Sequence, residues 1–196
     1  MPAGPIDDLI SHFSRLPGIG ERTATRLAFH LLRASSSFRD GFARSIEGLS
    51  KIHLCSQCST VTDIDPCSIC KSPLRETKMI CVVEKPSDIY SIERLHSYSG
   101  TYHVLHGLLS PIDGITPQDL RLQQLFHRVG EERPEELILA LSPTVEGDAT
   151  AAYIAKQING KIPLSRLAAG LPMGSDLEFA DQITLGKAFE ARTRLR

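Results

Sequence analysis

Four cysteines fall in two closely spaced pairs, a pattern typical of a metal site. They are Cys55, Cys58, Cys67 and Cys70, with the spacing C-x2-C-x8-C-x2-C. Four thiolates in a tetrahedral set suit zinc. Because protein ligands would fill every position, no place is left for water or substrate, and we expect one structural zinc ion per chain. An iron–sulfur cluster and two redox pairs are the alternatives. Cys81 lies in the apolar run 79–83 and is expected to be a buried packing residue.

Acidic side chains follow three of the predicted strands. They are Glu84 at the end of 79–84, Asp113 in the loop after 101–105, and Glu146 and Asp148 after 136–141. The carboxyl ends of parallel strands share one edge of a sheet, so these carboxylates could form an acidic cluster. Carboxylate oxygens are the ligands that Mg²⁺ prefers. Helix capping by Asp148 and a solvated loop around Asp113 are the alternative interpretation.

Basic residues gather near the N-terminus. Residues 9–46 hold six arginines and two acids, a net charge of +4, although the whole chain has a net charge of −1. Arginine suits phosphate contacts better than lysine does, because its planar guanidinium offers several fixed donors. This excess indicates either a nucleic-acid contact or a solvated helical face.

The same region has the pattern of two short helices joined by a tight turn. Apolar residues at helical spacing predict helices over 6–13 and 21–32, and the sequence LPGIG at 16–20 breaks the helix between them. Glycines allow close backbone approach, and free N–H groups opening the second helix can bind a phosphate. Arg22 and Arg26 lie one turn apart there, and Arg15 precedes the turn. A hairpin that only packs a core or an oligomer interface is the alternative.

The remaining elements alternate between strand and helix. A third helix is predicted over 38–53, capped by Ser36 or Ser37, and strands are predicted over 79–84, 101–105, 136–141 and 161–165. Helices are predicted over 87–95, from the capping box at Thr116, over 148–158, and from the capping box at Ser175 towards Arg194. This alternation predicts an α/β fold with a mainly parallel sheet covered by helices.

Composition agrees with a folded protein. The chain has 196 residues, of which 41% are hydrophobic and 23% charged. These values exclude a disordered chain, a collagen-like chain and a wholly basic DNA-coating protein. No apolar run approaches the roughly 18 residues that a membrane helix needs. The first residues carry acids where a signal peptide has bases. We therefore expect a cytoplasmic protein without disulfides and without membrane contact.

Two resemblances make these patterns specific. A strand ending in Glu84, followed by Glu146-Gly147-Asp148 after a later strand, looks like the toprim domain of topoisomerases and primases, although that family has Asp where this chain has Glu146. The order of helix-hairpin-helix, four-cysteine motif, toprim domain and C-terminal helix resembles the RecR family of bacterial recombination mediators across essentially the whole chain. We expect these parts at residues 1–54, 55–70, 78–174 and 175–196.

The resemblance to RecR implies a function that spacing alone does not. RecR proteins are not known as catalysts; they act with RecO and RecF in recombinational repair and help load RecA onto gapped single-stranded DNA. They form ring-shaped tetramers, dimers of dimers, that can encircle DNA. By this resemblance, Arg15, Arg22 and Arg26 would contact single- and double-stranded DNA near the nucleoid. Glu84, Asp113, Glu146 and Asp148 would contact a partner or hold Mg²⁺ weakly.

Two other classes of function remain open from the sequence. A Mg²⁺-dependent toprim nuclease or primase-like enzyme would need the carboxylates in reactive geometry, and 196 residues leave little room for a polymerising region. A topoisomerase would need a tyrosine in a separate domain, whereas all four tyrosines fall in the predicted sheet region. A scaffold without DNA contact is the third class, and it would show no salt-dependent DNA binding.

Overall fold

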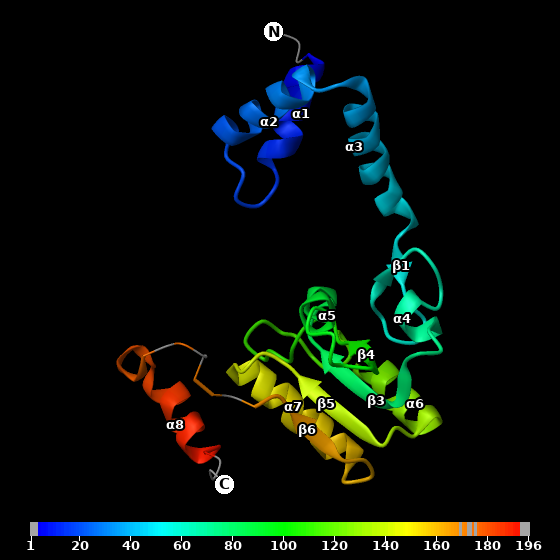
Figure 1. Cartoon of the computed structure of the whole chain (residues 1–196), viewed down its shortest axis with the longest axis vertical. Coiled ribbons are helices and arrows are strands. Elements are labelled where there is room, and N and C mark those ends of the chain that lie inside the picture. Colours follow the sequence, from blue (N-terminus) through cyan, green and yellow to red (C-terminus); the bar gives the residue numbers. More distant parts are fainter. Residues whose placement is uncertain (1–3, 169, 172–173, 175, 193–196) are drawn as a thin grey trace. The chain divides into compact units, whose positions relative to one another are not determined.

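The structure is a computed structural model that describes residues 4–168, 170–171, 174 and 176–192 (Figure 1). The chain divides into two compact units, Met1–Ile52 and His53–Arg196. We describe each unit by itself. None of the helices in the described part of the chain is both long enough and apolar enough to span a membrane.

The N-terminal unit begins with the predicted helical hairpin. Helix α1 (Pro5–Ser14) opens on proline with two aspartates in its first turn, and α2 (Glu21–Arg33) follows the LPGIG turn. Gly18 in that turn has φ +77°, a conformation that glycine adopts without strain. Ala24 and Ala28 are the buried residues of α2, and their small side chains let the two helices pack closely.

Helix α3 (Ser36–Gly48) completes this unit and is shorter than predicted. Ser35, rather than Ser36 or Ser37, caps it by accepting a hydrogen bond from the Phe38 N–H at 3.3 Å. The helix gives way to a 3₁₀ turn, η1 (Leu49–Lys51), and His53 already belongs to a strand. The prediction of a helix to His53 was therefore wrong over its last turn.

The second unit begins with the four-cysteine segment. Strands β1 (His53–Leu54) and β2 (Val61–Thr62) pair antiparallel, and α4 (Ser68–Lys71) follows them. None of these short elements was predicted, because two-residue strands are too short to produce a periodic pattern.

A four-stranded sheet forms the centre of this unit. Its strands are β3 (Glu76–Val83), β4 (Gly100–Val104), β5 (Glu136–Ala140) and β6 (Leu164–Arg166), in the order β4-β3-β5-β6. All neighbouring pairs are parallel, which confirms the predicted fold class. Because the strands are parallel, residues 84, 113 and 146–148 follow them at the same edge, the carboxyl edge.

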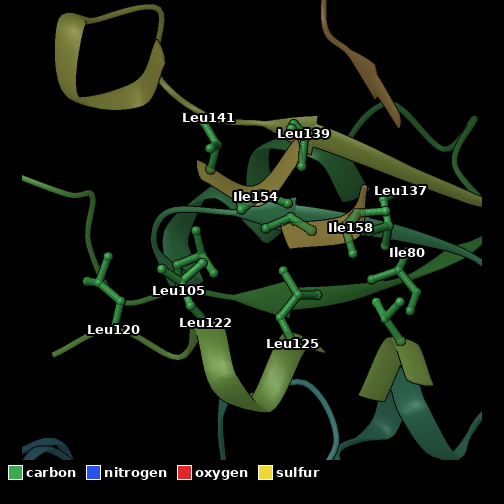
Figure 2. Close-up of a cluster of buried hydrophobic side chains, with 12 residues drawn as sticks. Ile80, Leu105, Leu120, Leu122, Leu125, Leu137, Leu139, Leu141, Ile154 and Ile158 are labelled. Carbon is green, nitrogen blue, oxygen red and sulfur yellow. The ribbon is translucent and has the colours of Figure 1, made fainter. Parts of the chain in front are cut away.

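Helices cover both faces of the sheet. Helices α6 (Leu122–Glu132) and α7 (Val145–Ile158) bury one face, and Figure 2 shows their leucines and isoleucines meeting those of the strands. Helix α5 (Pro86–Glu93) and Ile69 of α4 pack on a second cluster formed by Cys81, Val83, Tyr102 and Val104. The four-cysteine segment therefore shares a hydrophobic core with the sheet.

Two helix starts differ from the prediction. Asp119 accepts hydrogen bonds from the Thr116 N–H at 2.8 Å and hydroxyl at 2.6 Å, but this motif closes a separate turn and α6 begins only at Leu122. Helix α7 begins three residues earlier than predicted, at Val145, because Thr144 caps it by accepting from the Gly147 N–H at 3.1 Å. Glu146 and Asp148 therefore both lie in its first turn.

The last helix also starts later than its predicted cap. After a 3₁₀ turn, η2 (Leu177–Phe179), helix α8 (Gln182–Glu190) is capped by Asp181, which accepts from the Ile183 and Thr184 N–H groups. The predicted cap Ser175 and the end at Arg194 lie outside the described residues.

Candidate functional site

The four predicted cysteines come together at one point. Their sulfur atoms all lie within 4.8 Å of one another, and three of the four residues are buried. A zinc ion about 2.3 Å from each of four sulfurs in a tetrahedron requires sulfur separations of about 3.8 Å. The Cys58 and Cys67 sulfurs, at 3.6 Å, are close to that separation. The cysteines therefore fit one structural zinc ion.

Thiol chemistry also favours a cation at this point. A hydrogen bond with Cys70 lowers the pKa of Cys58 to about 6 and raises the pKa of Cys70. Burial raises the pKa of Cys67 to about 11. Without a cation, one thiolate is stabilised at the expense of its neighbours. A divalent cation offsets the repulsion among four thiolates, so the set can ionise together when zinc binds.

Residues outside the cysteine pattern fix this segment in place. Asp65 accepts from the Ser56 N–H at 2.8 Å, joining the two cysteine pairs. The Val104 N–H at the end of β4 donates to the Cys58 carbonyl at 2.8 Å. His106 Nε2 donates to the Ser59 carbonyl at 2.6 Å. No spacing in the sequence indicates Asp65 or His106, since each acts on a backbone group that is distant in the chain.

The hairpin exposes its arginines and its turn. Arg15, Arg22 and Arg26 are all exposed, and none of them forms an ion pair with another described residue. A Cβ added at Gly18 or Gly20 would meet no atom within 4 Å, so the backbone of the turn faces open space.

The start of α2 adds further donors beside that turn. Gly20 is the N-cap of α2 and provides no side-chain cap for its first N–H groups. Uncapped N–H groups and the positive end of the helix dipole favour an anion. Together with Arg22 and Arg26, they can contact a nucleic-acid backbone without reading its sequence.

The predicted acidic residues occupy the carboxyl edge of the sheet but have separate partners. Glu84 accepts from the Ser142 hydroxyl at 2.8 Å and pairs with Lys85 at 2.9 Å. Asp113 accepts from the Ser110 hydroxyl at 2.6 Å. Asp148 pairs with Arg166 at 2.5 Å and lies 4.0 Å from the Lys187 ammonium. Glu146 is half-buried in the first turn of α7.

The expected acidic cluster is not formed. Among the described residues, the cysteine set is the only group of three or more His, Cys, Asp or Glu side chains close enough to share an ion. Basic residues or hydroxyls, rather than neighbouring carboxylates, surround Glu84, Asp113 and Asp148. The structure therefore places these acids near one edge of the sheet, where Glu84, Asp113 and Asp148 have separate partners.

Family sequence models match four successive parts of the chain. The Toprim domain matches residues 78–168, and the helix-hairpin-helix of RecR matches residues 6–48. The four-cysteine zinc finger domain of RecR matches residues 52–72, and the C-terminal part of RecR matches residues 170–193.

Full-length relatives agree with these matches. The chain is 47% identical over 195 residues to the recombination protein RecR of Anaeromyxobacter dehalogenans, covering 98% of each chain. It is 46% identical over 197 residues to that of Myxococcus xanthus, covering 100% of each. It is 48% identical over 195 residues to that of Heliobacterium modesticaldum, covering 98% of each.

Proposed function

Because the chain belongs to the RecR family of recombination proteins, we propose that it acts in recombinational DNA repair as a DNA-binding mediator rather than as an enzyme. In this proposal it works with RecO and RecF to help load RecA onto gapped single-stranded DNA. The work takes place in the cytoplasm, at the nucleoid. The observation that carries the DNA-binding part is the exposed hairpin turn flanked by Arg15, Arg22 and Arg26.

Each hairpin offers only a few phosphate contacts, so several chains must contribute to a firm grip. Linked weak contacts give high overall affinity when they can engage the same DNA together. A ring-shaped homotetramer, built as a dimer of dimers, would present four hairpins to one DNA molecule. Four hairpins acting together would bind DNA even though each chain has a net charge of −1.

The N-terminal unit supports such an assembly through its exposed apolar side chains. Ala24 and Ala28 are the only buried apolar residues among those described in this unit. Larger side chains are exposed on α2, on α3 and on the segments that flank them: Leu16, Leu27, Phe29, Leu32, Phe38, Phe42, Ile46 and Leu49. Apolar surface of this extent is typical of a protein–protein interface.

For the carboxylates we propose partner contact, with at most weak Mg²⁺ binding. Phosphoryl transfer requires carboxylates that share a metal ion in a fixed geometry. Glu84 and Asp148 instead each pair with a basic residue. Glu146, which stands where the toprim pattern has Asp, has a longer side chain that would displace a metal ion. Acidic groups held apart at one exposed edge suit recognition of a basic partner surface.

The hairpin proposal can be tested by DNA affinity. We expect Arg22→Ala combined with Arg26→Ala to weaken binding to single- and double-stranded oligonucleotides at least tenfold. The log–log salt slope on duplex DNA should fall by about 0.9 for each phosphate that the protein no longer neutralises. Fluorescence anisotropy over a salt series measures both quantities.

Matched variants distinguish the effect of the hairpin arginines on DNA affinity from the effect of removing positive charge elsewhere in the same unit. Arg33→Ala combined with Arg44→Ala removes the same charge from exposed positions of the same unit outside the turn. Glu146→Gln changes the other unit. Both should leave affinity and slope nearly unchanged. Equal losses of affinity in the two arginine pairs would remove the hairpin turn from the DNA surface.

A further inference from the structure

The outer seam between α6 and α7 is open. The inward side chains of these helices fill the core, as Figure 2 shows for Leu122, Leu125, Ile154 and Ile158. Along the outer side lie two adjoining cavities of about 450 and 650 Å³. Both are lined by Phe126 and Gln157, so the two cavities adjoin there, and we call them together the seam groove.

Apolar side chains line part of both cavities of the seam groove. The rings of Phe126 and Tyr153 have centroids 6.3 Å apart at an interplanar angle of 45°, and both side chains are half-buried. Further along, Val129 and Ile158 are buried and Ile162 is half-buried. A concave apolar surface of this kind can hold an apolar side chain of a ligand.

One end of the seam groove is cationic. Among the residues that the structure describes, Arg133 and Lys161 are the only charged ones lining either cavity, and no acid lines them. Both are exposed, and neither forms an ion pair with another described residue. Residues 53–196 contain 15 basic and 18 acidic residues, so a groove with basic side chains alone departs from the charge of its surroundings.

A basic residue after a helix also suits the helix dipole, so charge alone would not indicate a site. The two cations together with apolar side chains and two side-chain amides do indicate a site. Gln123 and Gln157 are exposed along the groove, and each can donate to and accept from a peptide backbone. We propose that the seam groove binds a short acidic peptide segment of a partner protein. An apolar side chain lies on the floor, and carboxylates pair with Arg133 and Lys161.

Two other occupants fit less well. Nucleic acid requires a longer row of cations and an exposed stacking face, whereas this groove has two cations and its rings are half-buried. The segment 176–181 of a second copy is acidic and exposes Phe179. Within one chain, that segment leads into α8, and the Lys187 ammonium of α8 lies 4.0 Å from Asp148 in the first turn of α7. The segment is therefore connected to the end of α7 that is opposite to Lys161. We therefore favour a partner protein.

The test uses the full chain loaded with zinc and a fluorescein-labelled peptide in which one phenylalanine is flanked by aspartates. We expect saturable binding by anisotropy. Lys161→Glu should weaken it at least tenfold. Arg133→Asn should also weaken it, and asparagine tolerates the left-handed conformation of this position, where φ is 48°. Lys156→Glu, an exposed change on α7 outside the groove, should leave binding unchanged.

Several results would overturn the proposal. The first is that the peptide does not bind. The second is that the Lys161→Glu and Lys156→Glu variants bind the peptide with equal affinity. The third is that the protein binds a peptide with alanine in place of phenylalanine as tightly as the original peptide. Displacement of the peptide by an oligonucleotide would assign the groove to DNA. Loss of self-association in both Lys161→Glu and Phe179→Ala would assign it to a second copy. The Arg22→Ala, Arg26→Ala chain should still bind the peptide, so the proposal can fail independently of DNA binding.

Discussion

At the residue scale, the buried imidazole of His103 makes the stability of the fold sensitive to acid. Its side chain is fully buried in β4, where Nε2 donates to the Arg121 carbonyl at 2.8 Å and Nδ1 has no partner among the described residues. Burial lowers the pKa of His103 to about 4. The folded state therefore keeps this ring neutral at a pH at which the unfolded chain would protonate it.

The sign of the pH effect follows from this difference. Between about pH 6.5 and 4 the unfolded state binds the extra proton, so the contribution of His103 to stability is complete above pH 6.5 and falls with acidification. We expect a loss of about 2 kcal/mol between pH 7 and pH 5. His103→Gln keeps a donor for the Arg121 carbonyl and should lack this loss. Urea unfolding of zinc-loaded protein at both pH values measures it; equal losses in both proteins would contradict this role of His103.

Gly147 lies between the two acids of α7 and has no room for a side chain. A Cβ there would lie 1.9 Å from the Ser142 carbonyl oxygen, a backbone atom that cannot easily move. We expect Gly147→Ala to destabilise the fold by about 2 kcal/mol or more, in the range of overpacked cores. Gly130→Ala is the matched control, because its Cβ meets open space in α6. It should stabilise by about 0.5 kcal/mol. Similar unfolding midpoints for the two variants would contradict the steric argument.

The residues of the candidate site were predictable to different degrees. The cysteine spacing is enough to predict the metal site, because each short pair offers two thiolates to one ion. The positions of Glu84, Asp113, Glu146 and Asp148 at one edge follow from the parallel strands. The separate partners of these acids could not be predicted, because partners such as Arg166 and Ser142 are distant from them in the sequence. For the same reason His106 could not be predicted.

At the element scale, periodic patterns locate the longer helices and strands, and tertiary context sets their ends. The capping box at Thr116 forms its hydrogen bond with Asp119 within a separate turn. Helix α6 therefore does not begin there, although the sequence motif is present. Strands β1 and β2 are held by the cysteine segment around them rather than by their own pattern. A metal-dependent element of this size has too little core to be read from hydrophobicity.

The folding of the four-cysteine segment should therefore depend on bound zinc. We expect Cys58→Ser to reduce bound zinc from one ion per chain to none and to remove hydrogen-exchange protection from residues 53–72. The parallel sheet should keep its protection, because most of its core is formed by α6, α7 and the strands.

Cys81→Ala is the control for this experiment. Cys81 is buried in β3, outside the metal set, and its burial raises the pKa of its thiol to about 12. This variant should keep its zinc. A zinc-free Cys58→Ser chain with full protection over residues 53–72 would contradict a structural role for the ion.

At the scale of the whole molecule, charge and apolar surface are unevenly distributed. The N-terminal unit combines an arginine-rich hairpin with exposed leucines and phenylalanines, whereas the second unit buries hydrophobic clusters on both faces of its sheet. The hairpin can serve DNA while the apolar surface is buried between chains, because different side chains carry the two roles. A single chain would leave that surface in water, which is unfavourable.

The central claim is that several copies of this chain assemble and hold DNA through their hairpins. Light scattering of the purified 21.5-kDa chain, with and without single- and double-stranded DNA at low salt, tests it most directly. We expect a tetramer, or a dimer that becomes a tetramer on DNA. With Arg22→Ala and Arg26→Ala, the protein should still assemble but bind DNA weakly. A monomer that ignores DNA would contradict the account.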